Sequence, residues 1–183
     1  MENIKEQKKA LRRAYKARGE ALTMQYRKEA DRAIREKILR DTRWQRARGV
    51  FLYVSVGAEP DTHALIGAAL REGKRVYVPR CLPDRTMEAA RIRSLAELRP
   101  GAFGIPEPPA DAEAALPGEL GLAIVPCVTA TESGARLGHG AGYYDRFLRR
   151  HACPAVCLCY RALLADTLPT EAHDVAMDAV VCD

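Results

Sequence analysis

Three glycines alternate with other residues in the segment Arg136–Phe147, whose sequence is RLGHGAGYYDRF. The glycines Gly138, Gly140 and Gly142 follow an apolar segment and precede a stretch with helical character. Glycine lets the backbone approach a ligand closely and adopt positive φ, and a helix N-terminus presents unpaired N–H groups with positive partial charge. Such an arrangement suits a bound phosphate group.

Basic and titratable side chains in the same segment strengthen the phosphate interpretation. Arg136, His139 and Arg146 surround the glycines in sequence, and such groups pair with phosphate oxygens. The segment is not a Walker A motif, because no Gly-Lys-Ser/Thr follows, and it lacks G-x-G-x-x-G spacing with a downstream acid. A tight turn between a strand and a helix explains the glycines equally well, so both interpretations stay open at this point.

Positive charge is concentrated in residues 1–48, which contain sixteen Lys and Arg against seven Asp and Glu, whereas the whole chain has a net charge of only +5. A segment of this kind is the solvated face of helices, a nucleic-acid surface or part of an anion-binding site. The segment carries no helix-turn-helix, zinc-finger or aromatic RNA-binding signature, so a nucleic-acid surface is the least favoured of these three interpretations.

Composition narrows the class of protein. The chain has 183 residues, of which 48% are hydrophobic and 29% are charged, which predicts one globular domain over residues 1–183 and excludes collagen-like or mostly disordered chains. The apolar run Ala152–Tyr160 is far shorter than the ~20 residues of a membrane-spanning helix, and the N-terminus lacks the apolar stretch of a signal peptide. We therefore expect a cytoplasmic protein with no membrane partner.

Six cysteines raise the question of zinc. Cys153, Cys157 and Cys159 have the spacing C-x3-C-x-C within an apolar segment, with no matching second pair, whereas structural zinc sites use paired ligands. The alternation of Cys157 and Cys159 places both on one face of a strand. Reduced thiols that pack as small apolar groups are therefore favoured over a metal site.

An alternation of strands and helices must position these groups. Helices are expected over residues 4–17, with Gly19 as the stop, over 23–39, from Asp61 or Thr62 to 71, and over 143–151; strands are expected over 50–56, 75–79, 88–92, 122–125, 155–160 and 179–182. The order strand, helix, strand predicts a mostly parallel sheet flanked by helices, with an antiparallel excursion within 82–95. The basic helices of 1–48 thus precede an α/β core over 49–183, in which the Pro- and Gly-rich segment 99–118 forms a crossing loop or lid.

Five segments then carry a resemblance to a known family. They are KKALRR (8–13), AEPDT (58–62), GKRVYVPR (73–80), FGIPEP (103–108) and RLGHGAGYYDRFL (136–148). In this order, over nearly the whole chain, they resemble 5-formyltetrahydrofolate cyclo-ligases, also called methenyltetrahydrofolate synthetases, and the stretch ending in GYYD is the most specific. The resemblance implies a three-layer α/β/α domain of the NagB/RpiA/CoA-transferase-like type.

The resemblance also implies a reaction. Family members convert 5-formyltetrahydrofolate and ATP into 5,10-methenyltetrahydrofolate, ADP and phosphate, with magnesium as cofactor. ATP phosphorylates the formyl oxygen, N10 of the folate attacks the activated carbon, and phosphate leaves. This chemistry needs cations and N–H groups around the triphosphate, magnesium on its oxygens, and an acceptor nearly in line.

The matching positions of this sequence receive roles from the resemblance. The residues that match ATP-binding positions are Lys8, Lys9, Ala10, Leu11, Arg12, Arg136, Leu137, Gly138, His139, Gly140, Ala141, Gly142, Tyr143 and Tyr144. Those that match substrate-binding positions are Val56, Asp61, His139, Gly140, Ala141, Gly142 and Tyr143. The expected catalytic residues are Asp61, Arg136, His139 and Tyr143, and the expected magnesium ligands are Asp145 and Asp178. Ordinary structural roles compete with these: surface helix charge for the lysines and arginines, first-turn acids or N-caps for the aspartates, and partly buried aromatics for the tyrosines.

The site is expected at the carboxyl ends of the strands, where the loops after Val56, Pro126 and the C-terminal strand meet. Asp61, Gly140 and Asp178 should therefore face one another. His139 and Ala141 depart from the residues usual in the family loop, which predicts pH-sensitive activity. Two alternatives remain: a relative that uses ATP on another small amide or carbonyl compound, and a non-catalytic folate- or nucleic-acid-binding protein. A monomer is expected, since no coiled-coil pattern is present.

Overall fold

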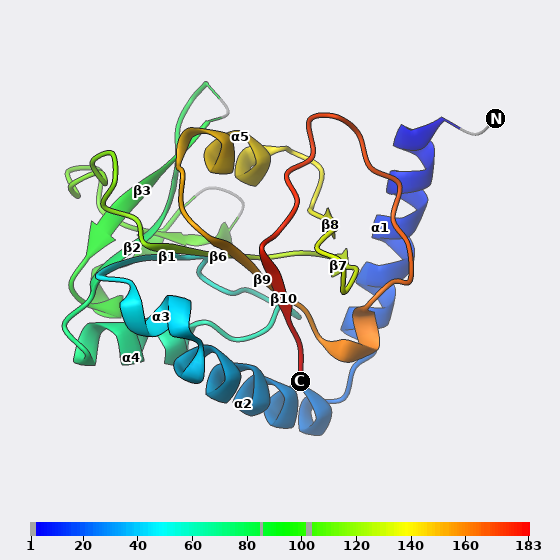
Figure 1. Ribbon diagram of the computed structural model, residues 1–183, viewed down its shortest axis with the longest axis horizontal. Helices are drawn as coiled ribbons and strands as arrows, with labels where there is room; N and C mark the ends of the chain where they lie inside the picture. The colour runs from blue at the N-terminus through cyan, green and yellow to red at the C-terminus, as the bar shows by residue number, and fades with distance from the viewer. Residues whose placement is uncertain (1–2, 85, 102–103) are drawn as a thin grey trace.

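The structure is a computed structural model that describes residues 3–84, 86–101 and 104–183. Its centre is a six-stranded sheet in the order β10-β9-β6-β1-β2-β3 (Figure 1). The strands are β1 (Gly49–Leu52), β2 (Arg75–Cys81), β3 (Met87–Ile92), β6 (Leu122–Val125), β9 (Ala155–Leu158) and β10 (Ala179–Val181). All neighbours are parallel except β2 and β3. The predicted mostly parallel sheet with an antiparallel excursion is confirmed.

Helices cover both faces of this sheet. They are α1 (Ile4–Glu20), α2 (Met24–Arg40), α3 (Thr42–Arg46), α4 (His63–Arg71) and α5 (Tyr143–Arg150). Figure 1 shows α5 on one side of the sheet and α2, α3 and α4 on the other, which gives the three layers. Helix α1 stands at one end of the molecule, where it contacts the short 3-10 helix η3 (Arg161–Leu163).

The core forms where the sequence is continuously apolar. Strands β1, β6 and β9 are buried along their whole length, as expected for parallel strands covered on both faces. Helix α2 contributes Ala30, Ile34 and Ile38 to the same hydrophobic cluster, and their spacing of four places them on one helix face. The hydroxyl of Thr23 accepts a hydrogen bond from the Tyr26 N–H, so Thr23 is the N-cap of α2.

Several element boundaries differ from the prediction. Helix α1 continues through Gly19 to Glu20, so this glycine does not end the helix; it is buried beside Leu163. The strand expected over 50–56 ends at Leu52. The following residues turn back toward α4, because the Thr62 hydroxyl donates to the Tyr53 carbonyl oxygen and accepts from the Ser55 N–H.

Short elements were not predicted. They are α3, the 3-10 helix η1 (Leu95–Glu97), the ladder of β4 (Arg99–Pro100) with β5 (Pro106–Glu107), and the ladder of β7 (Thr129–Ala130) with β8 (Arg136–Leu137). The segment 99–118 also lies along β3, because Ala115 N donates to Ala89 O and Arg91 N donates to Glu113 O. Phe103, part of the FGIPEP match, lies outside the described residues. Among the helices that the structure does describe, none has the length and apolar character needed to cross a bilayer.

Candidate active site

A cavity of about 1080 Å³ opens at the carboxyl ends of β1, β6 and β9. The residues that follow these strands, Tyr53, Pro126 and Cys159 among them, form its floor, while α1 and residues 136–145 line its sides. This is the predicted edge of the sheet. The loops after β1 and β6 contribute as predicted, but the third contributing strand is β9. The segment after the C-terminal strand β10 does not line the cavity.

The glycine-rich segment bends around arginine side chains. Arg12 Nε donates to the Gly138 carbonyl oxygen at 2.8 Å, and Arg146 Nη2 donates to the Ala141 carbonyl oxygen at 2.9 Å. Gly140 has a φ of 103°, and Gly142 has a φ of 71° at the N-cap of α5. These are backbone conformations that favour glycine. The loop therefore leads into the N-terminus of α5, and two carbonyl oxygens of the loop accept hydrogen bonds from guanidinium groups.

Arg136 ties this loop to the neighbouring strand. Its Nη1 donates to the Pro126 carbonyl oxygen at 3.1 Å, its Nη2 donates to Asp145 Oδ1 at 3.0 Å, and its guanidinium lies 5.8 Å from the centre of the Tyr144 ring. The side chain is only 2% exposed, and its buried Nε has no partner among the described residues. A Cβ atom at Gly138 would lie 2.7 Å from Arg136 Nη1, so the bare backbone there leaves room for the guanidinium.

Lys8 binds two acidic side chains at the α1 side of the cavity. Its Nζ lies 2.9 Å from Glu171 Oε2 and 2.6 Å from Asp174 Oδ2, although Lys8 is only 5% exposed. Burial alone would lower the pKa of Lys8, but the hydrogen bonds to Asp174 and Glu171 outweigh it and raise the pKa. Likewise, burial opposes ionisation of Asp174, yet Lys8 holds the pKa of that carboxyl below its usual value.

The acidic pair belongs to a group with the composition of a cation site. Ligand atoms of Glu171, His173 and Asp174 all lie within 4.8 Å of one another, and the three residues line the cavity. Carboxylate oxygens are the ligands that hard divalent cations prefer. The ammonium group of Lys8 supplies the positive charge at these carboxylates in the structure.

Replacement of Lys8 by methionine is expected to lower Tm by about 3 °C at neutral pH, because two carboxylates then lose their cation. The pKa values of Glu171 and Asp174 are lowered by folding, so their contribution to stability is present above their ordinary values of 4.5 and 3.8 and disappears as the pH falls through the lower folded values. The pKa of Lys8 is raised, so its contribution persists below 10.5 and disappears at still higher pH.

Thermal unfolding of wild type and the Lys8→Met variant from pH 3 to pH 11 checks this expectation. The two Tm curves should be farthest apart between about pH 5 and pH 10 and should converge toward both ends. Lys9→Met, which changes an exposed neighbour, serves as the matched control. A Tm difference that stays constant across the whole range would contradict the ionic account.

Glu59 faces the glycine-rich loop from the segment after β1. Its Oε1 lies 3.2 Å from His139 Nε2, and its Oε2 accepts a hydrogen bond from the Val56 N–H at 2.9 Å. The side chain is 15% exposed and lines the cavity. The carbonyl oxygen of Glu59 accepts from the Tyr160 hydroxyl at 3.3 Å. A carboxylate and an imidazole thus meet across the cavity opening, one from each loop.

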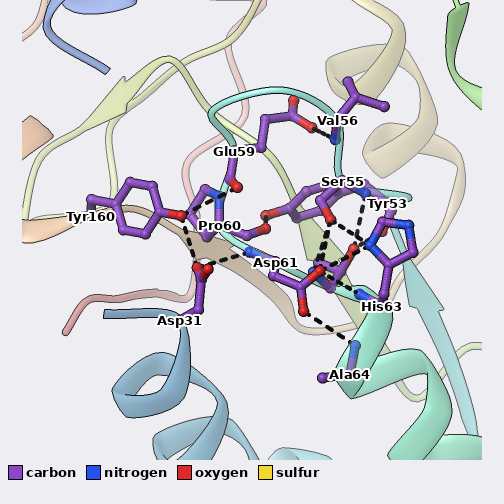
Figure 2. A network of polar contacts seen from close by, with 11 residues as sticks. Asp31, Tyr53, Ser55, Val56, Glu59, Pro60, Asp61, His63, Ala64 and Tyr160 are labelled. Atoms are coloured by element: carbon purple, nitrogen blue, oxygen red, sulfur yellow. Dashed lines mark hydrogen bonds and ion pairs between the residues drawn. The ribbon is translucent and has the colours of Figure 1, made fainter. Parts of the chain in front are cut away.

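Asp61 points away from Glu59, on the other side of the chain (Figure 2). Its carboxylate lies 2.9 Å from His63 Nδ1 and accepts hydrogen bonds from the N–H groups of His63 and Ala64, at the start of α4. Burial would raise the pKa of Asp61, but these contacts with His63 and Ala64 lower it. Asp61 therefore caps α4 and does not line the large cavity, so its predicted place opposite the glycine-rich loop is wrong.

Comparison with known proteins agrees with the sequence resemblance. The family model described as "5-formyltetrahydrofolate cyclo-ligase family" matches residues 4–183. The chain belongs to this family. A 5-formyltetrahydrofolate cyclo-ligase of Mycolicibacterium smegmatis is 38% identical over 142 residues, which cover 73% of each chain, and one of Haemophilus influenzae is 31% identical, with coverage of 85% of this chain and 87% of the relative.

A solved structure is similar in fold as well. The solution structure of 5,10-methenyltetrahydrofolate synthetase from Aquifex aeolicus superposes with a TM-score of 0.85 at 29% sequence identity, covering 95% of this chain and 88% of that one. The sheet and its helices are therefore those of a cyclo-ligase family member.

Most residues predicted for the cyclo-ligase site do line the large cavity. These are Lys8, Lys9, Arg12, Val56, Arg136, Leu137, Gly138, His139, Gly140, Ala141, Gly142, Tyr143, Tyr144 and Asp145. Ala10 and Leu11, from the predicted ATP-binding segment of α1, do not line it. The helical period of α1 explains this difference, since only one face of the helix is turned to the cavity.

Asp178 does not join Asp145. Its Oδ2 accepts a hydrogen bond from the Ala155 N–H at 2.7 Å, at the amino ends of β9 and β10, which is the opposite edge of the sheet from the cavity. The structure therefore does not bring Asp145 and Asp178, the predicted magnesium residues, together. Asp145 itself binds Arg136 and accepts from the Val175 N–H at 3.2 Å, which places it beside the segment that carries Asp174.

Six acidic residues that line the cavity were not predicted: Glu6, Glu20, Glu59, Glu107, Glu171 and Asp174. Two of them lie close in sequence to an acid that was predicted: Glu59 is two positions before Asp61, and Asp174 is four positions before Asp178. Segments without helical or strand period give no sign of which acid faces the cavity. The position of Glu59 inside the AEPDT match (58–62) was the usable signal.

Proposed function

We propose that this chain catalyses the ATP-dependent conversion of 5-formyltetrahydrofolate into 5,10-methenyltetrahydrofolate, with release of ADP and phosphate. One observation carries the proposal: the glycine-rich loop at the N-terminus of α5 faces Glu59 across a single cavity of about 1080 Å³. This volume is at the upper end of the range for small-molecule pockets, as a site for two substrates requires. The names of the family and of the relatives supply the substrate.

The cationic side of the cavity fits the triphosphate. The N–H groups at the start of α5 favour phosphate oxygens, and Lys9, Arg12 and Arg136 add positive charge around the same loop. In phosphoryl transfer, charge develops on the equatorial oxygens of the transferred group, so fixed cations and N–H groups lower the barrier. We assign to this part of the chain the binding and alignment of ATP.

The folate is placed on the Glu59 side. A carboxylate accepts hydrogen bonds from the amino and ring N–H groups of a pterin, and the Glu59 carboxylate has His139 as a neighbour. The γ-phosphoryl group passes to the formyl oxygen, N10 then attacks the formyl carbon, and the C–O bond breaks to release phosphate. Tyr143, which lines the same cavity, is assigned to cover the pterin ring.

The acidic group of the cavity fits a magnesium ion. Its ligand atoms lie close together and include the carboxylate oxygens of Glu171 and Asp174, so we assign the metal to these residues in place of the pair Asp145 and Asp178. Magnesium would neutralise phosphate charge there. Lys8, which binds the two carboxylates in this structure, is then released to pair with phosphate oxygens.

The direct test mixes purified protein with 5-formyltetrahydrofolate, ATP and magnesium and follows the near-ultraviolet absorbance of the conjugated methenyl bridge. The absorbance should rise only when all three are present. A protein that binds ATP but gives no rise with 5-formyltetrahydrofolate would point to a relative with another amide or carbonyl substrate, and the proposal would be wrong.

Glu59→Gln is expected to lower kcat/KM for 5-formyltetrahydrofolate by about thirtyfold, because a charged hydrogen-bond acceptor in a largely buried position becomes neutral. Asp61→Asn changes an acid in the same segment that faces the other way, so it should cost less than about threefold. Steady-state kinetics with ATP saturating checks both values. A larger loss in Asp61→Asn than in Glu59→Gln would return the substrate role to Asp61.

A further inference from the structure

The segment that carries Glu59 has open space on both sides. A second cavity, of about 740 Å³, lies on the other side of this segment from the large cavity. Four residues line both cavities: Val56, Gly57, Glu59 and Tyr160. Residues 56–61 thus form a thin wall, and they belong to no strand or helix. A wall with few packing neighbours has little local stability of its own, so polar bonds must set its position.

Two side chains from distant elements hold the main chain of this wall at Glu59 and Asp61 (Figure 2). The Tyr160 hydroxyl, just after β9, lies 3.3 Å from the carbonyl oxygen of Glu59. Asp31, on α2, accepts the N–H of Asp61 through Oδ1 at 3.0 Å. The same Oδ1 accepts a hydrogen bond from the Tyr160 hydroxyl at 2.8 Å. The two side chains therefore form one unit that joins α2, the end of β9 and the wall.

Burial keeps this unit in place. Tyr160 is only 1% exposed, and its ring packs edge-on against the ring of Tyr26, with the two centroids 5.9 Å apart. Burial and the hydrogen bond to Asp31 raise the pKa of Tyr160, so its hydroxyl stays a donor. Hydrogen bonds to charged acceptors are stronger than those to neutral ones. The Asp31 carboxylate therefore fixes the direction of the Tyr160 hydroxyl.

A separate bond holds the residue between Glu59 and Asp61. The hydroxyl of Tyr53 donates to the Pro60 carbonyl oxygen at 2.7 Å, and Tyr53 is only 2% exposed. Three successive main-chain groups are thus bound by side chains, where a regular element would use a neighbouring strand or turn. Such groups need partners when they are buried. The number of these bonds indicates that the position of the wall is tightly specified.

The position of the wall decides where the Glu59 carboxylate lies. Its Oε1 is 3.2 Å from His139 Nε2, and its Oε2 accepts the N–H of Val56 at 2.9 Å. Groups that bind a reacting substrate work when they are held within about 0.5 Å of the productive geometry. A displacement of about 1 Å can cost about a hundredfold in rate. A carboxylate on an irregular segment therefore needs support from outside that segment.

We propose that Asp31 and Tyr160 are positioning residues for the reaction, which hold Glu59 opposite the glycine-rich loop. The inference rests on the proposed function, because it takes Glu59 as the residue that binds the pterin. Both side chains act through the main chain of residues 59–61 rather than through contact with the substrate. Loss of the Tyr160 hydroxyl should therefore impair the role of Glu59 and should matter little once Glu59 is neutral.

The experiment is a double-mutant cycle of Tyr160→Phe and Glu59→Gln, measured by the methenyl absorbance at saturating ATP. Alone, Tyr160→Phe should lower kcat/KM for 5-formyltetrahydrofolate about tenfold, because it removes the hydroxyl and keeps the buried ring. In the Glu59→Gln background, the same substitution should change kcat/KM by less than about twofold. The Kd for ATP, measured by titration calorimetry, should stay unchanged in every variant.

Asp31 gives an independent comparison. Asp31→Ala should match Tyr160→Phe, whereas Asp31→Asn keeps one acceptor oxygen and should cost only about threefold in kcat/KM. Tyr26→Phe is the matched control, because it removes a neighbouring tyrosine hydroxyl whose partners are Asp183 and the N–H of Ala162. This control should lower Tm but leave kcat/KM within about twofold of wild type.

Each outcome decides the inference. An active wild type together with unchanged kcat/KM in Tyr160→Phe overturns the positioning role and leaves the proposed function standing. Equal losses from Tyr160→Phe in both backgrounds would mean general support of the fold, which also overturns the inference. A wild type that gives no methenyl absorbance would overturn both proposals, and full activity in Glu59→Gln would remove the residue to be positioned. If Tyr160→Phe fails to fold, Asp31→Asn takes its place in the cycle, with the expected threefold loss confined to the Glu59 background.

Discussion

An Arg136→Met variant is expected to lose about 3 kcal/mol of unfolding free energy and at least about a thousandfold of ATP-dependent activity. The guanidinium is 2% exposed and binds the Pro126 carbonyl oxygen and Asp145 Oδ1. Removal of one member of a buried ion pair leaves the other without its partner, which costs about 3–5 kcal/mol. Asp145 is 21% exposed, so water reduces this penalty and the lower value applies. Activity falls further because the loop loses both a cation and its anchor.

Urea unfolding and the methenyl absorbance assay measure the two effects of Arg136→Met. Arg150→Met, at an exposed position near the end of α5, is the matched control and should change stability by less than about 0.5 kcal/mol. Adding Asp145→Asn to Arg136→Met should restore part of the stability but none of the activity. A stability loss below about 1 kcal/mol in Arg136→Met would show that the pair contributes little.

Gly140→Val is expected to weaken ATP binding by about a hundredfold while the fold persists. Gly140 has a φ of 103°, which a β-branched residue tolerates poorly. A Cβ atom there would also lie 3.2 Å from Arg12 Cζ. The Arg12 guanidinium, whose Nε binds the Gly138 carbonyl oxygen, must therefore shift by a few tenths of an ångström, which displaces a group assigned to the triphosphate. Strained backbone of this kind costs about 1–3 kcal/mol, and we expect most of it to appear as lost nucleotide affinity.

Titration calorimetry with ATP alone measures binding without the reaction, so it isolates the effect of Gly140→Val on ATP affinity. Gly73→Val is a suitable comparison, because Gly73 has a φ of 72°, lies after α4 far along the chain from the loop, and has no atom within 4 Å of an added Cβ. It should lower stability without changing ATP affinity. Equal effects of both substitutions on ATP binding would show that general backbone strain, and not the contact with Arg12, is responsible.

The sheet could be predicted from the sequence because its buried strands are recognisable as short, continuously apolar segments. The segment 122–125 is continuously apolar and matches β6 without error, as buried parallel strands require. Boundaries failed where hydrogen bonds from distant residues decide them. The strand expected to reach Val56 ends at Leu52. The hydroxyl of Thr62, ten residues later, hydrogen-bonds the Tyr53 carbonyl oxygen and the Ser55 N–H in place of a neighbouring strand. No local pattern reports such a contact.

The glycine-rich loop and the acidic residues show the same contrast at the site. Alternating glycines, arginines and a helix start form a local pattern, and Gly138, Gly140 and Gly142 do line the cavity. The acids have no such pattern: Glu59 lines the large cavity and Asp61 does not, and Asp174 lines it and Asp178 does not. In irregular segments, a shift of a few residues reverses the direction of a side chain, and only tertiary contacts fix that direction.

The attachment of α1 has a consequence for its dynamics. This helix is joined to the cavity through polar contacts of Lys8 with Asp174 and of Arg12 with Gly138, and to η3 through a bond from Arg18 to the Ala162 carbonyl oxygen. A ligand that bridges α1 and the glycine-rich loop binds only the docked helix, so it shifts the local opening equilibrium of α1 by mass action. Amide protons of α1 should therefore exchange more slowly as nucleotide concentration rises, while those of the central strands stay unchanged.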